Sequence, residues 1–263
     1  MREVIVTTSL AKGLAVLNAL ERAGQPRSLR RLASETGLAK STIHRVVGEL
    51  RAAGLIETSS EGDHLGLRLF ELGGAALRQN HIAARARPYL EELYERSHHL
   101  TQLGVLRGTD VMYVVRVGRQ GHQLVASPLG GRMPASCTAV GKAILAFDDE
   151  ALERALLAGL ARRTRYSITD PDLLRATLAE TKRTRVATEL EEARVSLACV
   201  ASPVIVDGQV RAAVSVTMPA RLLDPPLHAP LVRAAATALS HSLSATRSGA
   251  LASALTTASK KLT

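Results

Sequence analysis

Apolar residues recur with helical spacing in three short segments of residues 1–54, and this spacing predicts three helices. The first is expected to begin at a cap on Thr8 or Ser9 and to end at Gly24. The second follows Ser28, and the third opens at Ser41. The apolar stripe of the first helix consists of Leu10, Leu14, Leu17 and Leu20, and that of the third consists of Ile43, Val46, Val47 and Leu50.

The pattern changes after residue 54, where short extended segments replace the helical spacing. Residues 55–57 and 64–69 are predicted strands, and the polar segment 59–63 between them is a predicted hairpin tip. Three short helices followed by a hairpin is the element order of a winged helix-turn-helix domain. The tip contains Glu61 and Asp63, so we do not expect it to enter a DNA groove deeply.

Residues 67–100 are predicted to form two helices divided near Asn80, and we place the domain boundary there. Strands and helices interleave beyond it, and the short link Asp207-Gly208-Gln209 predicts an antiparallel hairpin. We therefore expect an α+β protein with a winged helix-turn-helix domain (1–80), a sensory domain (81–245) and a disordered tail (246–263). The predicted strands are 102–106, 111–117, 124–127, 198–206 and 210–217, and the predicted helices are 139–146, 149–157, 171–184 and 231–243.

Composition narrows the class of protein. Of the 263 residues 46% are hydrophobic but only 2% aromatic, so the core must be aliphatic. The net charge of +10 favours nucleic acid as a partner, although residues 1–80 hold 11 basic against 8 acidic residues, a net of +3. The two cysteines form no CxxC pair, and neither a signal peptide nor a membrane span is expected. We expect a cytoplasmic protein with reduced thiols.

The third helix carries the pattern of a DNA-reading element. Its apolar stripe occupies one side, and the opposite side is small, polar and basic near the N-terminus, as close approach to the major groove requires. An ordinary amphipathic helix with a solvated face is the alternative for this helix taken alone, but the helix and turn before it and the hairpin after it favour DNA binding. The candidate DNA-binding residues are Arg30, Lys40, Ser41, Thr42, His44 and Arg45.

Five separated motifs resemble the IclR family of transcription regulators. Ser9–Leu17 resembles the family's first-helix opening, and Gly37–Arg45 resembles its recognition-helix signature. Leu65-Gly66, followed by Glu71-Leu72-Gly73, resembles the exit from the wing. In the second domain, Pro134–Ala143 resembles the effector-loop motif and Glu189–Val204 the late strand motif. This chain has Arg185-Val186 where the family often has Gly-Tyr, and Ser196 where it often has Gly.

The resemblance implies a GAF-like C-terminal domain, a homodimer or dimer of dimers, and a small-molecule effector, often an organic acid. Thr138 can cap the helix that starts at Ala139, and Ser215 and Thr217 alternate onto one face of a strand. A helix cap and satisfied core hydroxyls are the alternative reading of these residues. The candidate effector-binding residues are Met133, Cys137, Thr138, Ala139, Cys199, Ser215 and Thr217.

These observations predict a sequence-specific transcriptional regulator, a repressor rather than an activator, whose affinity for an operator is controlled by the effector. The alternative is a thiol-based redox sensor that uses Cys137 and Cys199. HExxH, GxSxG, P-loop and GxGxxG spacings are absent, so we expect no enzyme, and no cofactor or metal is expected.

Overall fold

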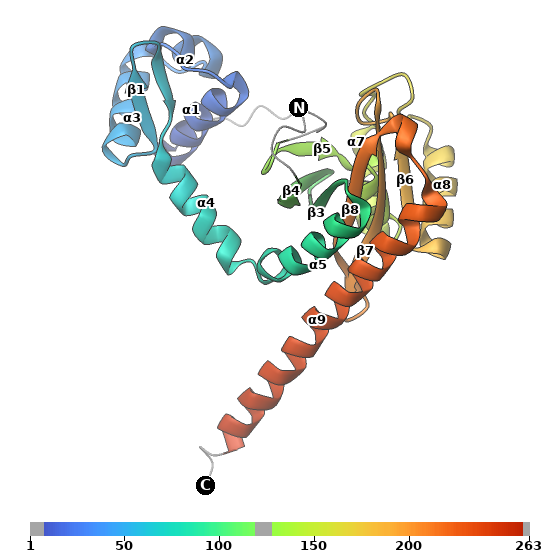
Figure 1. Ribbon diagram of the computed structural model, residues 1–263. Coiled ribbons are helices and arrows are strands. Elements are labelled where there is room, and N and C mark those ends of the chain that lie inside the picture. The colour runs from blue at the N-terminus through green and yellow to red at the C-terminus, as the bar shows by residue number, and fades with distance from the viewer. Residues whose placement is uncertain (1–7, 119–127, 260–263) are drawn as a thin grey trace. The chain divides into compact units, whose positions relative to one another are not determined.

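The computed structural model describes residues 8–118 and 128–259 and divides the chain into two compact units, residues 1–79 and 80–263 (Figure 1). No helix within the described ranges is long and apolar enough to cross a membrane.

The first unit contains three helices, a hairpin and a fourth helix. These are α1 (Ser9–Ala23), α2 (Leu29–Thr36), α3 (Lys40–Ala52), β1 (Ile56–Ser59), β2 (Gly62–Leu65) and α4 (Leu67–Gln79). The caps explain the boundaries: Thr8 Oγ1 accepts a hydrogen bond from Ala11 N, and Gly24 ends α1 at φ 62°. α3 begins at Lys40, one residue earlier than predicted, because Ala39 is its N-cap. The core of the unit consists of Val16, Ala19, Leu20, Leu32, Ile43, Val46, Val47 and Ile56.

The predicted apolar stripe of α1 is only half buried. Leu20 packs in the core, whereas Leu10 is 75% exposed and Leu14 is 50% exposed. Helical spacing correctly indicated a shared face, but the core of this unit covers only the C-terminal half of it.

Asp63 is not at the hairpin tip, as the sequence suggested, but on β2 with its side chain buried. Its backbone pairs with that of Arg27 through two hydrogen bonds. Its carboxylate binds Arg51 Nη2 at 2.6 Å and Thr58 Oγ1 at 2.7 Å. Asp63 therefore ties the hairpin to α3 and to the segment before α2.

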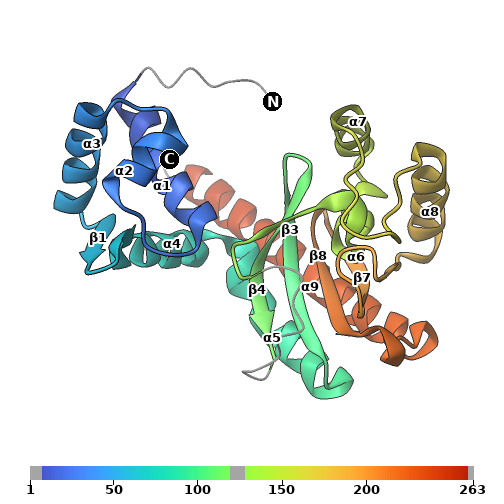
Figure 2. The same cartoon turned by 90° about the horizontal axis from the view of Figure 1, so that it is seen from above.

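The second unit is built on a six-stranded sheet in the order β5-β4-β3-β8-β7-β6, in which every neighbouring pair is antiparallel. One face packs against α5 (His81–Ser97) and α9 (Pro225–Ser259), and the other against α6 (Ala139–Leu145), as Figures 1 and 2 show. α7 (Asp149–Ala158) and α8 (Pro171–Thr184) lie beyond α6. The strands are β3 (Leu100–Arg107), β4 (Asp110–Val117), β5 (Arg132–Pro134), β6 (Ala187–Leu190), β7 (Leu197–Val206) and β8 (Gln209–Pro219).

The sequence predicted four of these strands, β3, β4, β7 and β8, and missed the short edge strands β5 and β6. The fifth predicted strand, 124–127, lies outside the described residues. Asn80 caps α5 at the predicted helix boundary. The helix predicted over 231–243 is part of α9, which continues to Ser259 through most of the segment expected to be disordered. That segment contains several Ala and Leu residues, which extend a helix once it has started.

Candidate nucleic-acid interface and ligand pocket

The candidate DNA-binding residues lie mainly on the exposed side of α3. Lys40, Ser41, His44 and Arg45 are exposed and Thr42 is half-buried, while Ile43, Val46 and Val47 on the opposite side are buried. Arg45 Nη1 bonds to Glu49 Oε1 at 2.7 Å one turn further along the helix. The structure therefore brings five of the six candidates onto one solvent-facing helix.

Arg30, the sixth candidate, is exposed on α2. The short turn after Thr36, with Gly37 at φ 69°, connects α2 to α3. The left-handed conformation at this position favours glycine because a Cβ would strain the backbone there. The two-helix geometry of a helix-turn-helix thus depends on the Gly37 turn.

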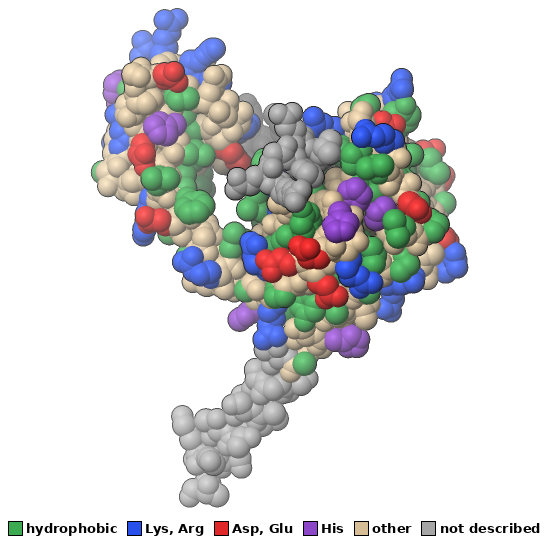
Figure 3. Space-filling view, in the orientation of Figure 1, with side chains coloured by type: hydrophobic (Ala, Val, Ile, Leu, Met, Phe, Trp, Pro, Cys, Tyr) green, Lys and Arg blue, Asp and Glu red, His purple; other side chains and the backbone are tan. Residues whose placement is uncertain are grey.

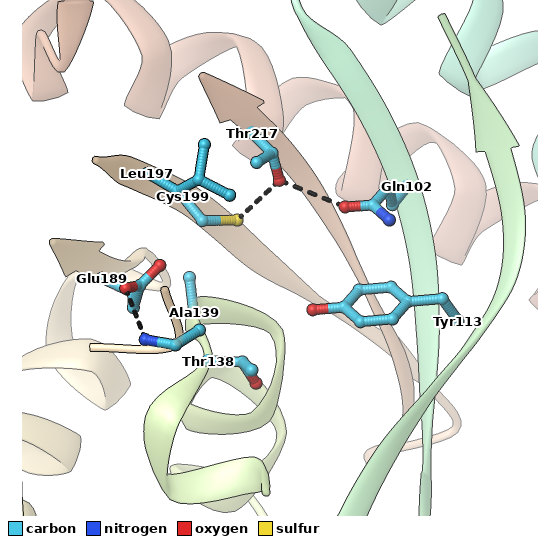
Figure 4. A pocket seen from close by; sticks show the side chains of 9 residues that line it. Gln102, Tyr113, Thr138, Ala139, Glu189, Leu197, Cys199 and Thr217 are labelled. Carbon is cyan, nitrogen blue, oxygen red and sulfur yellow. Dashed lines mark hydrogen bonds between the residues drawn. The ribbon is translucent and has the colours of Figure 1, made fainter. Parts of the chain in front are cut away.

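The second unit contains a small cavity of about 20 Å³ between α6 and the sheet (Figure 4). This space holds about one water molecule, far less than the roughly 300–1,000 Å³ of a small-molecule pocket, so the lining must move apart to admit a ligand. The lining residues come from β3, β4, β6, β7, β8, the start of α6 and the loop after β6. They are Gln102, Tyr113, Thr138, Ala139, Glu189, Ala193, Leu197, Cys199 and Thr217.

Four of the seven candidate effector-binding residues line this cavity: Thr138, Ala139, Cys199 and Thr217. The other three do not. Met133 is buried in the core on β5, and Cys137 lies in a short 3-10 turn with its thiol 3.1 Å from Ala161 O. Ser215 is completely buried on β8, two residues before Thr217.

Sequence reasoning missed Gln102, Tyr113 and Glu189, which supply much of the polar surface of the cavity. Side chains alternate between the two faces of a strand, and this alternation is the sequence signal that could have found them. Gln102 and Tyr113 lie on predicted strands, and Glu189 opens the late strand motif. The register of the sheet places Glu189 beside two residues that the sequence did predict: Glu189 pairs with Cys199, and Cys199 pairs with Thr217. Residues paired in this way share one face of the sheet.

Hydrogen bonds position the lining side chains on the sheet and at the start of α6. Thr217 Oγ1 donates to Gln102 Oε1 at 3.1 Å and lies 3.4 Å from Cys199 Sγ. Thr138 Oγ1 accepts from Gly141 N at 2.9 Å and so caps α6, as predicted. Figure 4 shows Glu189 and Tyr113 reaching the cavity from opposite sides.

The titratable groups of the cavity favour their neutral forms. The pKa of Glu189 is raised to about 7, mainly by burial and to a smaller extent by the charge of Glu192, against the lowering effects of the Ala193 N–H group and Lys142. Burial raises the pKa of Cys199 to about 12 and holds the pKa of Tyr113 above its ordinary value. Near neutral pH the lining is therefore polar, and only Glu189 changes charge.

Gly141 explains why the start of α6 is so tightly packed. A Cβ at Gly141 would lie 2.1 Å from Ala135 O and 2.4 Å from Ala135 Cα. Only glycine lets the 3-10 turn over Ala135–Cys137 fold back against α6. This turn places Thr138 and Ala139 at the cavity.

Two domain families match the chain. Residues 9–60 match the IclR helix-turn-helix domain, and residues 74–241 match the bacterial transcriptional regulator IclR C-terminal domain. The chain belongs to the IclR family. It is a transcriptional regulator with a helix-turn-helix domain and a GAF-like effector-binding domain, as the sequence motifs predicted.

Two curated regulators and one solved structure illustrate what the chain is similar to. The chain is 29% identical over 215 residues to the Pca regulon regulatory protein of Pseudomonas putida, with 80% of this chain and 74% of that protein covered. It is 27% identical to the HTH-type transcriptional repressor AllR of Escherichia coli, with 82% and 81% covered. An IclR homolog from Microbacterium hydrocarbonoxydans, solved in complex with 4-hydroxybenzoate, superposes with a TM-score of 0.80 at 28% identity, with 90% and 100% covered.

Proposed function

We propose that this IclR-family protein is a homodimeric repressor whose affinity for its operator changes when an organic acid occupies the α6 cavity. The observation that supports this most directly is the cavity itself, a small space lined by polar and apolar side chains from five strands, the loop after β6 and a helix start. Two relatives support repression and an organic-acid ligand. AllR is a repressor, and the Microbacterium homolog binds 4-hydroxybenzoate, an aromatic organic acid.

The proposed DNA contact is α3 in a major groove. The exposed Lys40 and Ser41 and the half-buried Thr42 lie at its N-terminal turn, where phosphate or base edges are commonly contacted. Arg45 is positioned for a base edge or a phosphate, and its bond to Glu49 is solvent-exposed, so little free energy is needed to break it. Arg30, on α2, is proposed to contact the sugar-phosphate backbone of the DNA.

The proposed dimer is supported by apolar side chains that the first unit leaves uncovered. On α1 these are Leu10 and Leu14, and on α4 they are Leu67 (71% exposed) and Phe70 (80% exposed). Apolar side chains on α4 are visible in Figure 3. Surfaces of this kind mark interaction sites, and a second copy provides the same surface by symmetry.

A redox mechanism is the weaker candidate. Both cysteines are buried and, because of that burial, the pKa of each thiol is raised. A reactive thiol needs the opposite, a lowered pKa and access to solvent. Peroxide treatment that releases DNA in the absence of any metabolite would favour the redox mechanism over the proposed one.

The experiment is a selection of bound DNA from a random pool, followed by affinity measurements at two salt concentrations. An enriched pseudopalindromic site supports a dimer on two half-sites. Arg45→Ala is expected to weaken binding to this site at least tenfold, whereas Arg107→Ala, an exposed change in the other unit, is expected to leave it unchanged. Salt-sensitive binding without sequence preference would contradict the proposal.

A further inference from the structure

Three ionisable side chains lie close together at the cavity of the second unit: Lys142, Glu189 and Glu192. Lys142, on α6, is only 1% exposed, and its Nζ lies 2.5 Å from Glu192 Oε1. Glu189, on β6, is also buried, and its Oε1 accepts a hydrogen bond from Ala193 N at 3.0 Å. The cluster holds two carboxyl groups and one ammonium group, and the ammonium is bonded to Glu192.

Glu189 is the member of this cluster that lines the cavity, whereas Lys142 and Glu192 do not. The lining contains no Lys or Arg side chain among the residues that the structure describes. An anion that enters therefore meets the Glu189 carboxyl group, while the ammonium group of the cluster, on Lys142, lies behind the lining and is bonded to Glu192. If Glu189 stayed ionised, two negative charges would share a small, poorly solvated space, which costs free energy.

We propose that the cavity binds its organic acid together with one proton, which Glu189 carries in the complex. This inference rests on the proposed function. The proton comes from solvent and adds to a carboxylate oxygen of Glu189. The site with a monoanionic ligand bound then has the same charge as the empty site with Glu189 ionised. The protonated carboxyl group then donates a hydrogen bond instead of repelling the ligand.

The groups around Glu189 are consistent with a proton that is exchanged near neutral pH. Lys142 faces it from α6, Glu192 from the loop after β6, Cys199 from β7 and Tyr113 from β4. Gln102 and Thr217, from β3 and β8, line the same cavity and do not titrate. With burial as the largest cause, the pKa of Glu189 is about 7, so Glu189 is mostly ionised in the empty cavity at pH 8.

The same cavity supplies hydrogen-bonding groups for the rest of the acid. Tyr113 remains a phenol because its pKa is raised, and Figure 4 shows it pointing toward the cavity opposite Glu189. The Thr217 hydroxyl and the Gln102 amide are bonded to each other at one end. Glu189 is therefore the one group whose charge decides between an anionic and a cationic ligand.

The test is calorimetry on the full-length protein with a panel of benzoate, 4-hydroxybenzoate, propionate and succinate. Titrations at pH 6.5–8.5 in two buffers of different ionisation enthalpy give the number of protons taken up. For the tightest acid, we expect close to one proton per site at pH 8 and an affinity that falls about tenfold per pH unit above 7. Infrared spectra should gain a protonated-carboxyl band when this acid binds at pH 8.

Glu189→Gln is the matched variant, because its amide resembles a protonated carboxyl group in size and donates a hydrogen bond. It is expected to bind the same acid with an affinity that does not change between pH 7 and 8.5 and without proton uptake. Binding by the wild-type protein without proton uptake, and without the infrared band, would overturn the inference and leave the proposed function intact. If no acid of the panel binds at any pH, the organic-acid effector of the proposed function fails as well.

Discussion

Cys199 and Thr217 are register partners on neighbouring strands, and the Thr217 hydroxyl lies 3.4 Å from the Cys199 thiol. Together with Glu189, which pairs with Cys199 on the other side, they form a row across β6, β7 and β8. Three residues that are distant in sequence thus form one wall of the cavity.

Thr217→Val should weaken effector binding while the fold is kept. Valine has nearly the shape of threonine but removes the hydroxyl that bonds to Gln102 Oε1. We expect this hydroxyl to bond to the bound acid, and the loss of one such neutral hydrogen bond, about 0.5–1.5 kcal/mol, corresponds to roughly a two- to twelvefold weaker affinity. Calorimetry measures it, with Thr188→Val on β6 as the control because residue 188 faces away from the row. An unchanged affinity of Thr217→Val would remove Thr217 from the site.

Gly141→Ala should destabilise the second unit. The added methyl group would lie 2.1 Å from Ala135 O, a backbone atom that cannot move without displacing the turn before α6. We expect a loss of about 3 kcal/mol or more in the free energy of unfolding. Gly73→Ala is the control, since Gly73 is also in a helix but a methyl group added there would have nothing within 4 Å. It should be neutral or stabilising by up to about 1 kcal/mol. Equal stability of the two variants in urea would contradict this account.

Ser196→Gly should stabilise the protein. Ser196 has φ 68°, in the left-handed region where a Cβ costs about 1 kcal/mol, and family members often carry glycine at this position. The gain should be up to about 0.6 kcal/mol after the greater freedom of glycine in the unfolded chain, about 0.4–1 kcal/mol, is subtracted. Ser34→Gly, on the exposed side of α2, is the control and should lose stability by a similar amount. Thermal unfolding of both variants measures the effect, and a destabilised Ser196→Gly would show that the serine side chain outweighs the strain.

Asp63→Ala should loosen the hairpin of the first unit. The buried carboxylate bonds to both Arg51 and Thr58, and its removal leaves these donors without this partner. Because the Arg51 side chain is 40% exposed, water can replace part of the lost interaction, and we expect a loss of about 1–3 kcal/mol. Hydrogen exchange of β1 and β2 amides should accelerate. Glu61→Ala, at the exposed tip, is the control and should leave exchange unchanged.

Much of the local structure could be predicted from the sequence, because it depends on short-range chemistry. The cap at Thr8, the stop at Gly24 and the helix boundary at Asn80 each rest on hydrogen bonds within four residues. The solvent-facing side of α3 follows from helical spacing alone, and five of its polar residues were found in this way. The edge strands β5 and β6 were missed because three or four residues carry too little alternation to be recognised.

The sequence by itself determined the order of the elements, the family motifs and the exposed face of α3, since these depend on local spacing. The tertiary structure alone decided which side chains line the cavity. From the hairpin link, Val206 pairs with Gln209, and that register continued without interruption would oppose Cys199 to Val216. An irregularity between Val204 and Ile205 shifts the register by one residue, so Thr217 faces Cys199 instead. One residue of shift exchanges the two faces of a strand, and no local pattern in the sequence specifies where such a shift occurs.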